Sequence, residues 1–161
     1  MIRKITLVIV TVFCIQLCFS QNIRKIRLDD IAALMDTSTT PLIINFWATW
    51  CQPCVHEIPW FEKNIEALQG KKVKLLLVNL DFLQYYPKAI AAFAKEHGYH
   101  SEIVWLEDMN REDFIKKISN RYSGTIPISI LVNNARHYRR YFEQQLPEER
   151  FKQELQKLIE N

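Results

Sequence analysis

The spacing of hydrophobic positions predicts alternating strands and helices along most of the chain. Residues 41–48 and 73–80 are mostly apolar, which is typical of strands buried on both faces of a sheet. Between them, residues 52–68 carry apolar side chains at three- and four-residue steps, and this spacing places them on one face of a helix. This part of the chain therefore has the pattern strand, helix, strand.

Residues that favour helix boundaries extend this pattern to the rest of the chain. Asp29 is expected to cap a short helix that ends at Met35, while Pro87 can start a later helix and Gly98 can end it. Pro59 should kink the helix over 52–68, because proline removes an internal hydrogen bond. The other predicted elements are strands at 23–28 and 101–106, a helix at 111–120, a strand–turn–strand unit at 128–142 and an amphipathic helix at 147–159.

The first twenty residues have the layout of a secretory signal. Arg3 and Lys4 precede an apolar run over residues 5–19, and Ser20 stands before a polar stretch. We expect cleavage after Ser20, which leaves residues 21–161 as one domain and places it in the periplasm or otherwise outside the cytoplasm. The alternative is an N-terminal membrane anchor, although the run is a little short for a spanning helix of about 20 residues.

Composition agrees with one small domain. A chain of 161 residues with 48% hydrophobic residues can bury a core without disulfide staples. Its formal net charge of +3 falls by two when Arg3 and Lys4 leave with the leader. The basic residues between 136 and 140 are explained by a solvated strand face, so we expect no nucleic-acid partner.

Cys51 and Cys54 are the residues whose spacing points to chemistry. Cys51 follows the strand over 41–48 and begins the helix over 52–68, where unpaired N–H groups and the helix dipole stabilise a thiolate. Cys54 lies three residues later on the same side of the helix, within reach of a disulfide bond. One thiol can therefore attack a partner disulfide while the other resolves the mixed disulfide.

Three other uses of this cysteine pair are weaker. A purely structural disulfide would close so short a loop that it would restrict the unfolded chain little. A structural zinc site needs four ligands, and Cys14 and Cys18 leave with the leader. Haem attachment needs histidine directly after the second cysteine, where this chain has Val55. We therefore expect a redox-active disulfide with no metal and no other cofactor.

Two segments of the sequence carry a resemblance to a known family. Residues 45–54, continued by Glu57, Ile58 and Pro59, and residues 124–127 before the strand over 128–132 resemble the thioredoxin superfamily. Within it, they resemble the secreted TlpA/ResA-like thiol–disulfide oxidoreductases, over nearly all of residues 21–161. The resemblance implies an α/β thioredoxin fold, with a central mixed sheet flanked by helices on both faces.

The same resemblance implies roles for residues at the site. Cys51 would be the exposed nucleophile and Cys54 the resolving thiol, with Pro127 as a cis-proline that faces the disulfide. A cis bond would present the backbone of Ile126 for strand-like pairing with an incoming peptide, whereas an ordinary trans proline would only start a strand. Trp50 is expected to shield the nucleophile and touch substrate, or else to cap the core.

Asn45 and Glu57 distinguish this chain from cytosolic thioredoxins. Thioredoxins carry a buried aspartate where this chain has Asn45, which cannot take a proton from the resolving thiol. We expect Glu57 to compensate for that missing acid, and the resemblance to TlpA/ResA-like proteins implies an acid at this position that tunes the thiols. The alternative for Glu57 is an exposed glutamate near the N-terminal end of its helix.

These observations predict an exported oxidoreductase that reduces disulfides of extracytoplasmic proteins through Cys51 and Cys54. Its partners would be protein thiols and disulfides, together with a membrane-embedded thiol electron donor that keeps the site reduced. The reductive direction comes from the family resemblance. A disulfide oxidase or isomerase, and a thioredoxin-fold module that binds a partner or carries a metal without turnover, remain alternatives.

Overall fold

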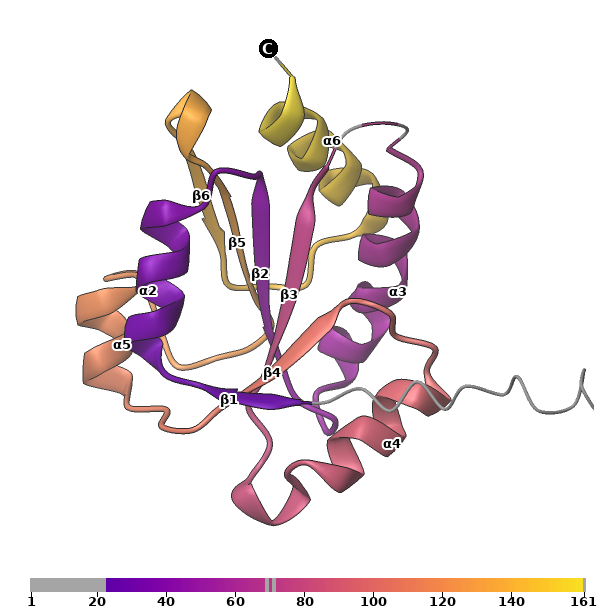
Figure 1. Cartoon of the computed structure of the whole chain (residues 1–161), viewed down its shortest axis with the longest axis vertical. Helices are drawn as coiled ribbons and strands as arrows, with labels where there is room; N and C mark the ends of the chain where they lie inside the picture. The colour runs from indigo at the N-terminus through magenta and orange to yellow at the C-terminus, as the bar shows by residue number, and fades with distance from the viewer. Residues whose placement is uncertain (1–22, 69, 71, 161) are drawn as a thin grey trace, which may run out of the picture.

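The computed structural model describes residues 23–68, 70 and 72–160, and the predicted leader and its cleavage site lie outside this part of the chain. The described residues form a six-stranded sheet with five α-helices (Figure 1). The strands are β1 (Arg24–Ile26), β2 (Leu42–Trp47), β3 (Lys74–Asn79), β4 (Glu102–Leu106), β5 (Ile128–Asn133) and β6 (Tyr138–Phe142). The helices are α2 (Leu28–Thr37), α3 (Gln52–Glu66), α4 (Lys88–Glu96), α5 (Arg111–Lys117) and α6 (Glu148–Ile159), with short 3-10 turns at Leu83–Tyr85 and Asn134–Arg136.

The sheet is mixed and has the order β1-β4-β3-β2-β5-β6. Strands β1, β4, β3 and β2 pair in parallel, whereas β5 pairs antiparallel with both β2 and β6. The two apolar strands predicted as buried, β2 and β3, lie side by side in the middle of the sheet. The start of β5 lies at the same edge as the end of β2, because the two strands run in opposite directions.

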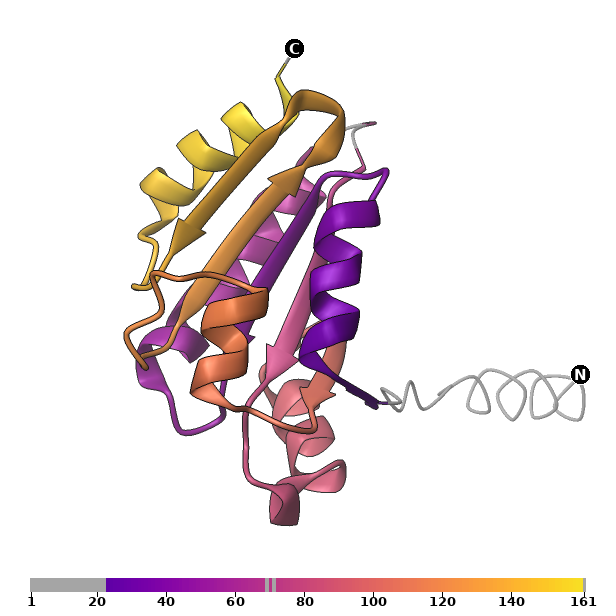
Figure 2. The same ribbon diagram turned by 90° about the vertical axis from the view of Figure 1, so that its left-hand side faces the viewer.

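Helices cover both faces of the sheet. Helices α2 and α5 lie on one face, and α3, α4 and α6 lie on the other (Figures 1 and 2). Alternation along the strands divides the core accordingly, since successive side chains point to opposite faces. In β2, Ile44 and Phe46 belong to the cluster under α2 and α5, while Ile43 and Trp47 belong to the cluster under the other three helices. The expected α/β fold with helices on both faces is confirmed.

The boundaries of several elements differ from the sequence-based expectations. Asp29 does not cap α2. Instead, Arg27 precedes the helix and donates its backbone N–H to the Asp30 side chain at 3.0 Å, while Asp29 lies in the first turn and pairs with Lys117 of α5 at 2.7 Å. Strand β1 and helix α5 are shorter than predicted, and α3 contains Pro59 as expected but ends at Glu66, two residues earlier than predicted. Local pattern alone fixes such boundaries poorly, because tertiary contacts extend or end each element.

In the described ranges 23–68 and 72–160, no helix has the length and apolar character needed to cross a membrane.

Candidate active site

The two cysteines are bonded to each other where β2 leads into α3. Strand β2 ends at Trp47, and Cys51 is the residue immediately before the first turn of α3. The Sγ atoms of Cys51 and Cys54 form a disulfide with an S–S distance of 1.97 Å. Cys54 is fully buried and Cys51 is only 5% exposed. The expectation of an exposed Cys51 is therefore wrong for the disulfide form, in which this side chain packs as part of the core beneath α3 and α4.

The start of α3 favours a thiolate at Cys51. The first turn of the helix contains no acidic side chain, so no carboxylate there opposes a negative charge. Backbone N–H groups at a helix N-terminus lack partners within the helix, and the helix dipole adds a positive potential. Both effects favour a negatively charged group at this position.

Glu57 lies three residues after Cys54 and is completely buried. Its Oε1 accepts a hydrogen bond from Nδ2 of Asn45 at 2.7 Å, and its Oε2 accepts one from the backbone N–H of Leu146 at 2.8 Å. Burial raises the pKa of Glu57 to about 8, although both hydrogen bonds favour the charged form and act in the opposite direction. The alternative of an exposed helix glutamate is wrong.

Asn45 faces Glu57 because of its position in β2. Alternate residues of a strand point to the same face of the sheet, and Ile43 and Trp47 belong to the core on the face that α3 covers. The side chain of Asn45, between them in the alternation, points to that face as well. Its neighbour across the antiparallel pair is Ser129 of β5, whose Oγ lies 3.0 Å from Asn45 Nδ2. Within the described residues, Asn45 Oδ1 is buried without a hydrogen-bond partner. Asn45, Glu57 and Ser129 thus form a buried polar group beside the apolar core under α3.

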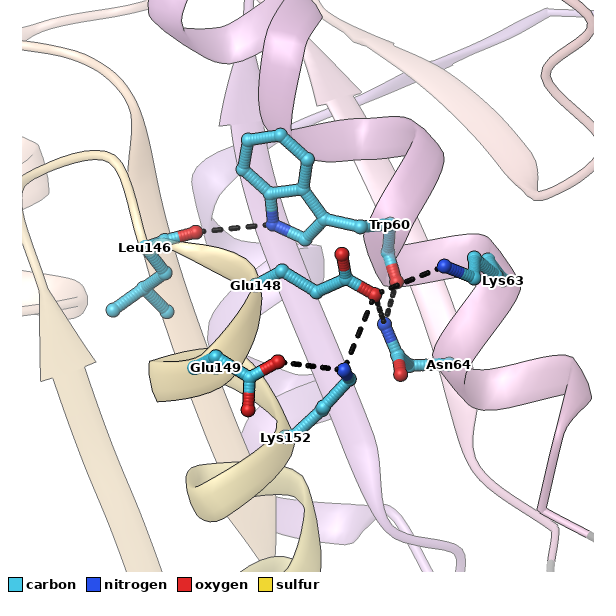
Figure 3. A network of polar contacts seen from close by, with 7 residues as sticks. All are labelled: Trp60, Lys63, Asn64, Leu146, Glu148, Glu149 and Lys152. Atoms are coloured by element: carbon cyan, nitrogen blue, oxygen red, sulfur yellow. Dashed lines mark hydrogen bonds and ion pairs between the residues drawn. The ribbon is translucent and has the colours of Figure 1, made fainter.

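Leu146 is held in place by α3 and by the start of α6. The indole N–H of Trp60 donates to the Leu146 carbonyl at 3.0 Å, as Figure 3 shows. Two residues later, Glu148 accepts hydrogen bonds from Asn64 at 3.0 Å and from Lys63 at 3.2 Å. These contacts fix the segment between β6 and α6 against α3. They thereby aim the Leu146 N–H at the Glu57 carboxylate.

The peptide bond between Ile126 and Pro127 is cis, as expected. Pro127 immediately precedes β5, and the pairing of Phe46 with Ile128 places it beside the last residue of β2. Pro127 and the disulfide therefore belong to the same edge of the sheet. Sequence reasoning did not anticipate a second cis bond, between Tyr86 and Pro87.

Trp50 stands next to Cys51 and is 57% exposed, which excludes the alternative that it caps the core. The turn that carries it is anchored by Asp81, a buried residue after β3. The Asp81 carboxylate accepts hydrogen bonds from the Thr49 backbone N–H at 3.2 Å and from the Thr49 hydroxyl at 2.9 Å. It also accepts one from the Asn79 side chain at 2.7 Å. Asp81 thus fixes the turn that carries Trp50.

Two parts of this arrangement were missed by sequence reasoning. The bond between Asn45 and Glu57 could have been suspected, because both are polar residues within apolar repeats that face one another. Nothing in the sequence marks Leu146 as a partner of Glu57, since its contribution is a backbone N–H.

Across residues 23–68 and 72–160, no group of three or more histidine, cysteine, aspartate or glutamate side chains is placed to hold a metal ion.

The chain is similar to a described protein family and to curated thiol-disulfide oxidoreductases. The sequence matches the family model described as AhpC/TSA family over residues 11–139. It is 28% identical over 127 residues to the thiol-disulfide oxidoreductase ResA of Geobacillus thermodenitrificans, covering 78% of this chain and 67% of that protein. It is 32% identical over 91 residues to the sporulation thiol-disulfide oxidoreductase A of Bacillus subtilis, covering 56% of this chain and 52% of that protein.

Solved structures agree on the fold. A thioredoxin-related protein from Neisseria meningitidis serogroup B aligns with a TM-score of 0.63 at 23% identity, covering 80% of this chain and 91% of that one.

The chain spans about half the length of several curated relatives that it matches. The family match nevertheless extends over most of the sequence, including the cysteine pair and the cis-proline. The chain therefore belongs to the thioredoxin-like AhpC/TSA family.

Proposed function

We propose that this protein is a thiol–disulfide oxidoreductase that reduces disulfides of proteins outside the cytoplasm. The observation that carries the proposal is the Cys51–Cys54 disulfide at the N-terminus of α3, beside the end of β2. A disulfide that closes so short a loop adds little to stability, whereas its position favours a thiolate in the reduced form. The names of the curated relatives, thiol-disulfide oxidoreductases, support the same activity.

The reaction consists of two exchanges. The Cys51 thiolate attacks one sulfur of the client disulfide, forms a Cys51–client bond and releases the first client thiolate, which takes a proton from solvent. Cys54 then loses its proton and attacks the Cys51 sulfur, which restores the Cys51–Cys54 bond and releases the second client thiolate. The client gains two electrons and two protons, and the protein's dithiol is oxidised. An external dithiol reduces the pair again.

In this proposal, Glu57 exchanges protons with the resolving thiol. Because its pKa is about 8, both its neutral and its charged form are present near neutral pH. The charged fraction can accept the proton of Cys54 as this thiol attacks, and the neutral form does not repel the thiolate. The i, i+3 spacing of the two residues along α3 supports this pairing.

Client binding is proposed for Trp50, Ile126 and Pro127. The exposed indole of Trp50 offers apolar contact area beside Cys51. The backbone of Ile126, before the cis bond, can pair with an extended client segment as an added strand does. Both contacts lie at the sheet edge that carries the disulfide.

The proposal also includes export by a cleaved leader. A membrane-embedded thiol donor then reduces the Cys51–Cys54 disulfide after each turnover. The basic and apolar pattern of the first twenty residues supports export. Outside the cytoplasm the surroundings favour disulfides, so a reductase there needs a dedicated supply of electrons. An oxidase or isomerase would use the same two cysteines with a different reduction potential.

Insulin reduction by dithiothreitol tests the activity. Substoichiometric wild-type protein should raise the rate far above the uncatalysed reaction, and Cys51→Ala should return it to background. A wild-type rate at background would refute the proposal and favour a binding module. Equilibration of the Cys51–Cys54 pair with glutathione gives its reduction potential, and a value well above that of glutathione would favour an oxidase over a reductase.

A further inference from the structure

The loop before the cis-proline converges on a single carboxylate. Three consecutive backbone N–H groups, those of Ser123, Gly124 and Thr125, lie 2.9, 3.2 and 3.1 Å from Oε1 of Glu143. The hydroxyls of Ser123 and Thr125 donate to the same oxygen at 2.7 and 3.2 Å. Successive N–H groups that point inward form a concave anion-binding site, and here the protein's own Glu143 occupies it.

The conformation of the loop depends on Gly124. Its φ of +110° lies in the region that residues with a Cβ rarely adopt. An added Cβ would meet no atom within 4 Å, so the demand for glycine is conformational rather than a matter of space. The chain therefore places glycine where it lets three N–H groups share one acceptor.

Glu143 is charged in this arrangement. Its partial burial acts to raise the pKa of the carboxyl, but hydrogen bonds from Ser123 and Thr125 outweigh this effect and hold the pKa below its ordinary value. Tyr141 adds a further hydrogen bond, from its hydroxyl to Oε2 at 3.3 Å. Hydrogen bonds to a charged acceptor are stronger than those to a neutral one.

Glu143 is itself held from both sides. Phe142, immediately before it, is the last residue of β6 and pairs with Ser129 of β5. Leu146, three residues after it, is bound through its carbonyl to Trp60 (Figure 3). Its backbone N–H donates to Glu57. Glu143 therefore provides a fixed point, and the loop that binds to it leads directly into Ile126 and Pro127.

We infer that Glu143 is a positioning residue, which holds residues 123–125 so that the backbone of Ile126 and Pro127 is preorganised to pair with client proteins. The inference rests on the proposed function and deepens it. It gives Glu143 a part in client binding that acts through the loop and not through contact with the client. A preorganised segment binds without first losing conformational freedom, and a loosened one binds more weakly.

Glu143→Gln tests the inference with insulin as client and dithiothreitol as reductant. The glutamine carbonyl retains one acceptor, but its amino group cannot accept, and the charge is lost. We expect KM for insulin to rise about tenfold while kcat changes little. The reason is that the loop stabilises the bound client equally in the ground state and in the transition state. The rate at which iodoacetamide alkylates Cys51 should stay within about twofold of wild type, because a small reagent does not use the loop.

Two further variants separate positioning from general damage. Glu149→Gln makes the same chemical change on α6, where the side chain is 81% exposed and pairs with Lys152, and it should leave KM unchanged. Ser123→Ala removes the shortest hydrogen bond but keeps the three backbone donors, so KM should rise by only about threefold. Hydrogen exchange of the amides at 123–125 should be at least about tenfold faster in Glu143→Gln, as expected for local loosening.

The outcomes are distinguishable. An unchanged KM for Glu143→Gln overturns the positioning role. So does a loss of activity in which kcat and the rate of Cys51 alkylation fall by the same factor. In both cases the oxidoreductase activity of the wild type stands. Unchanged amide exchange at 123–125 likewise overturns it. If the wild type itself fails to reduce insulin, the proposed function fails first and the inference falls with it.

Discussion

Glu57→Gln is the substitution whose effect follows most directly from the structure. The side chain is fully buried, and its pKa is raised from 4.5 to about 8, mainly by burial. Glutamine keeps the size of the protonated acid and cannot ionise. Its carbonyl can accept the Leu146 N–H, and its amino group can donate to Asn45 once the Asn45 amide turns to present Oδ1, which has no partner among the described residues.

The sign of the pH effect follows from the direction of the shift. With the pKa raised in the folded protein, the folded state binds more protons than the unfolded state between pH 4.5 and about 8. The stabilisation is therefore fully present below pH 4.5 and is lost as the pH rises through about 8. A shift of this size corresponds to ~5 kcal/mol in total, and to ~3 kcal/mol between pH 5 and pH 8.

Urea unfolding of the disulfide form measures this difference, because oxidised cysteines do not titrate. We expect the free energy of unfolding of wild type, relative to Glu57→Gln, to fall by ~3 kcal/mol from pH 5 to pH 8. Glu149→Gln makes the same chemical substitution at an exposed carboxylate of α6 and should track the wild type. The reasoning would be refuted by a difference between wild type and Glu57→Gln that stays constant, within about 0.5 kcal/mol, over this range.

Three other substitutions and one observation of the exported protein test further predictions. Cys54→Ala should accumulate a mixed disulfide between Cys51 and client on a non-reducing gel, because attack survives and release does not; preferential alkylation of Cys54 in the reduced wild type would reverse the assigned roles. Asn45→Asp should shift the pH profile of Cys51 alkylation, since a second buried acid couples its titration to that of the thiols; a superimposable profile would contradict this. Asp81→Ala should lower the free energy of unfolding by ~2–4 kcal/mol in urea, because it leaves buried donors unpaired, and a loss below about 0.5 kcal/mol would show that water replaces the carboxylate. Mass spectrometry of the exported protein should find Gln21 at or near its N-terminus, whereas an intact chain in the membrane fraction would indicate an anchor.

The sequence determined the features that depend on near neighbours. Cys51 and Cys54 are three residues apart at the start of a predicted helix, and this short separation brings their sulfur atoms within reach of each other. The apolar runs at β2 and β3 predicted buried strands, because only strands covered on both faces tolerate such composition. The cis bond before Pro127 was anticipated from the family resemblance and is present in the structure.

Tertiary structure alone decided what surrounds these features. Glu57 could have been exposed on α3 as far as helical spacing shows, and its burial follows from contacts with Asn45, 12 residues away, and Leu146, 89 residues away. The same holds for Glu143, whose role depends on a loop 18 to 20 residues earlier in the chain. Whether a carboxylate is charged depends on which protein groups replace the water around it. The partners of both glutamates include backbone N–H groups, which every residue except proline carries. No sequence pattern marks such partners, so only the folded chain reveals them.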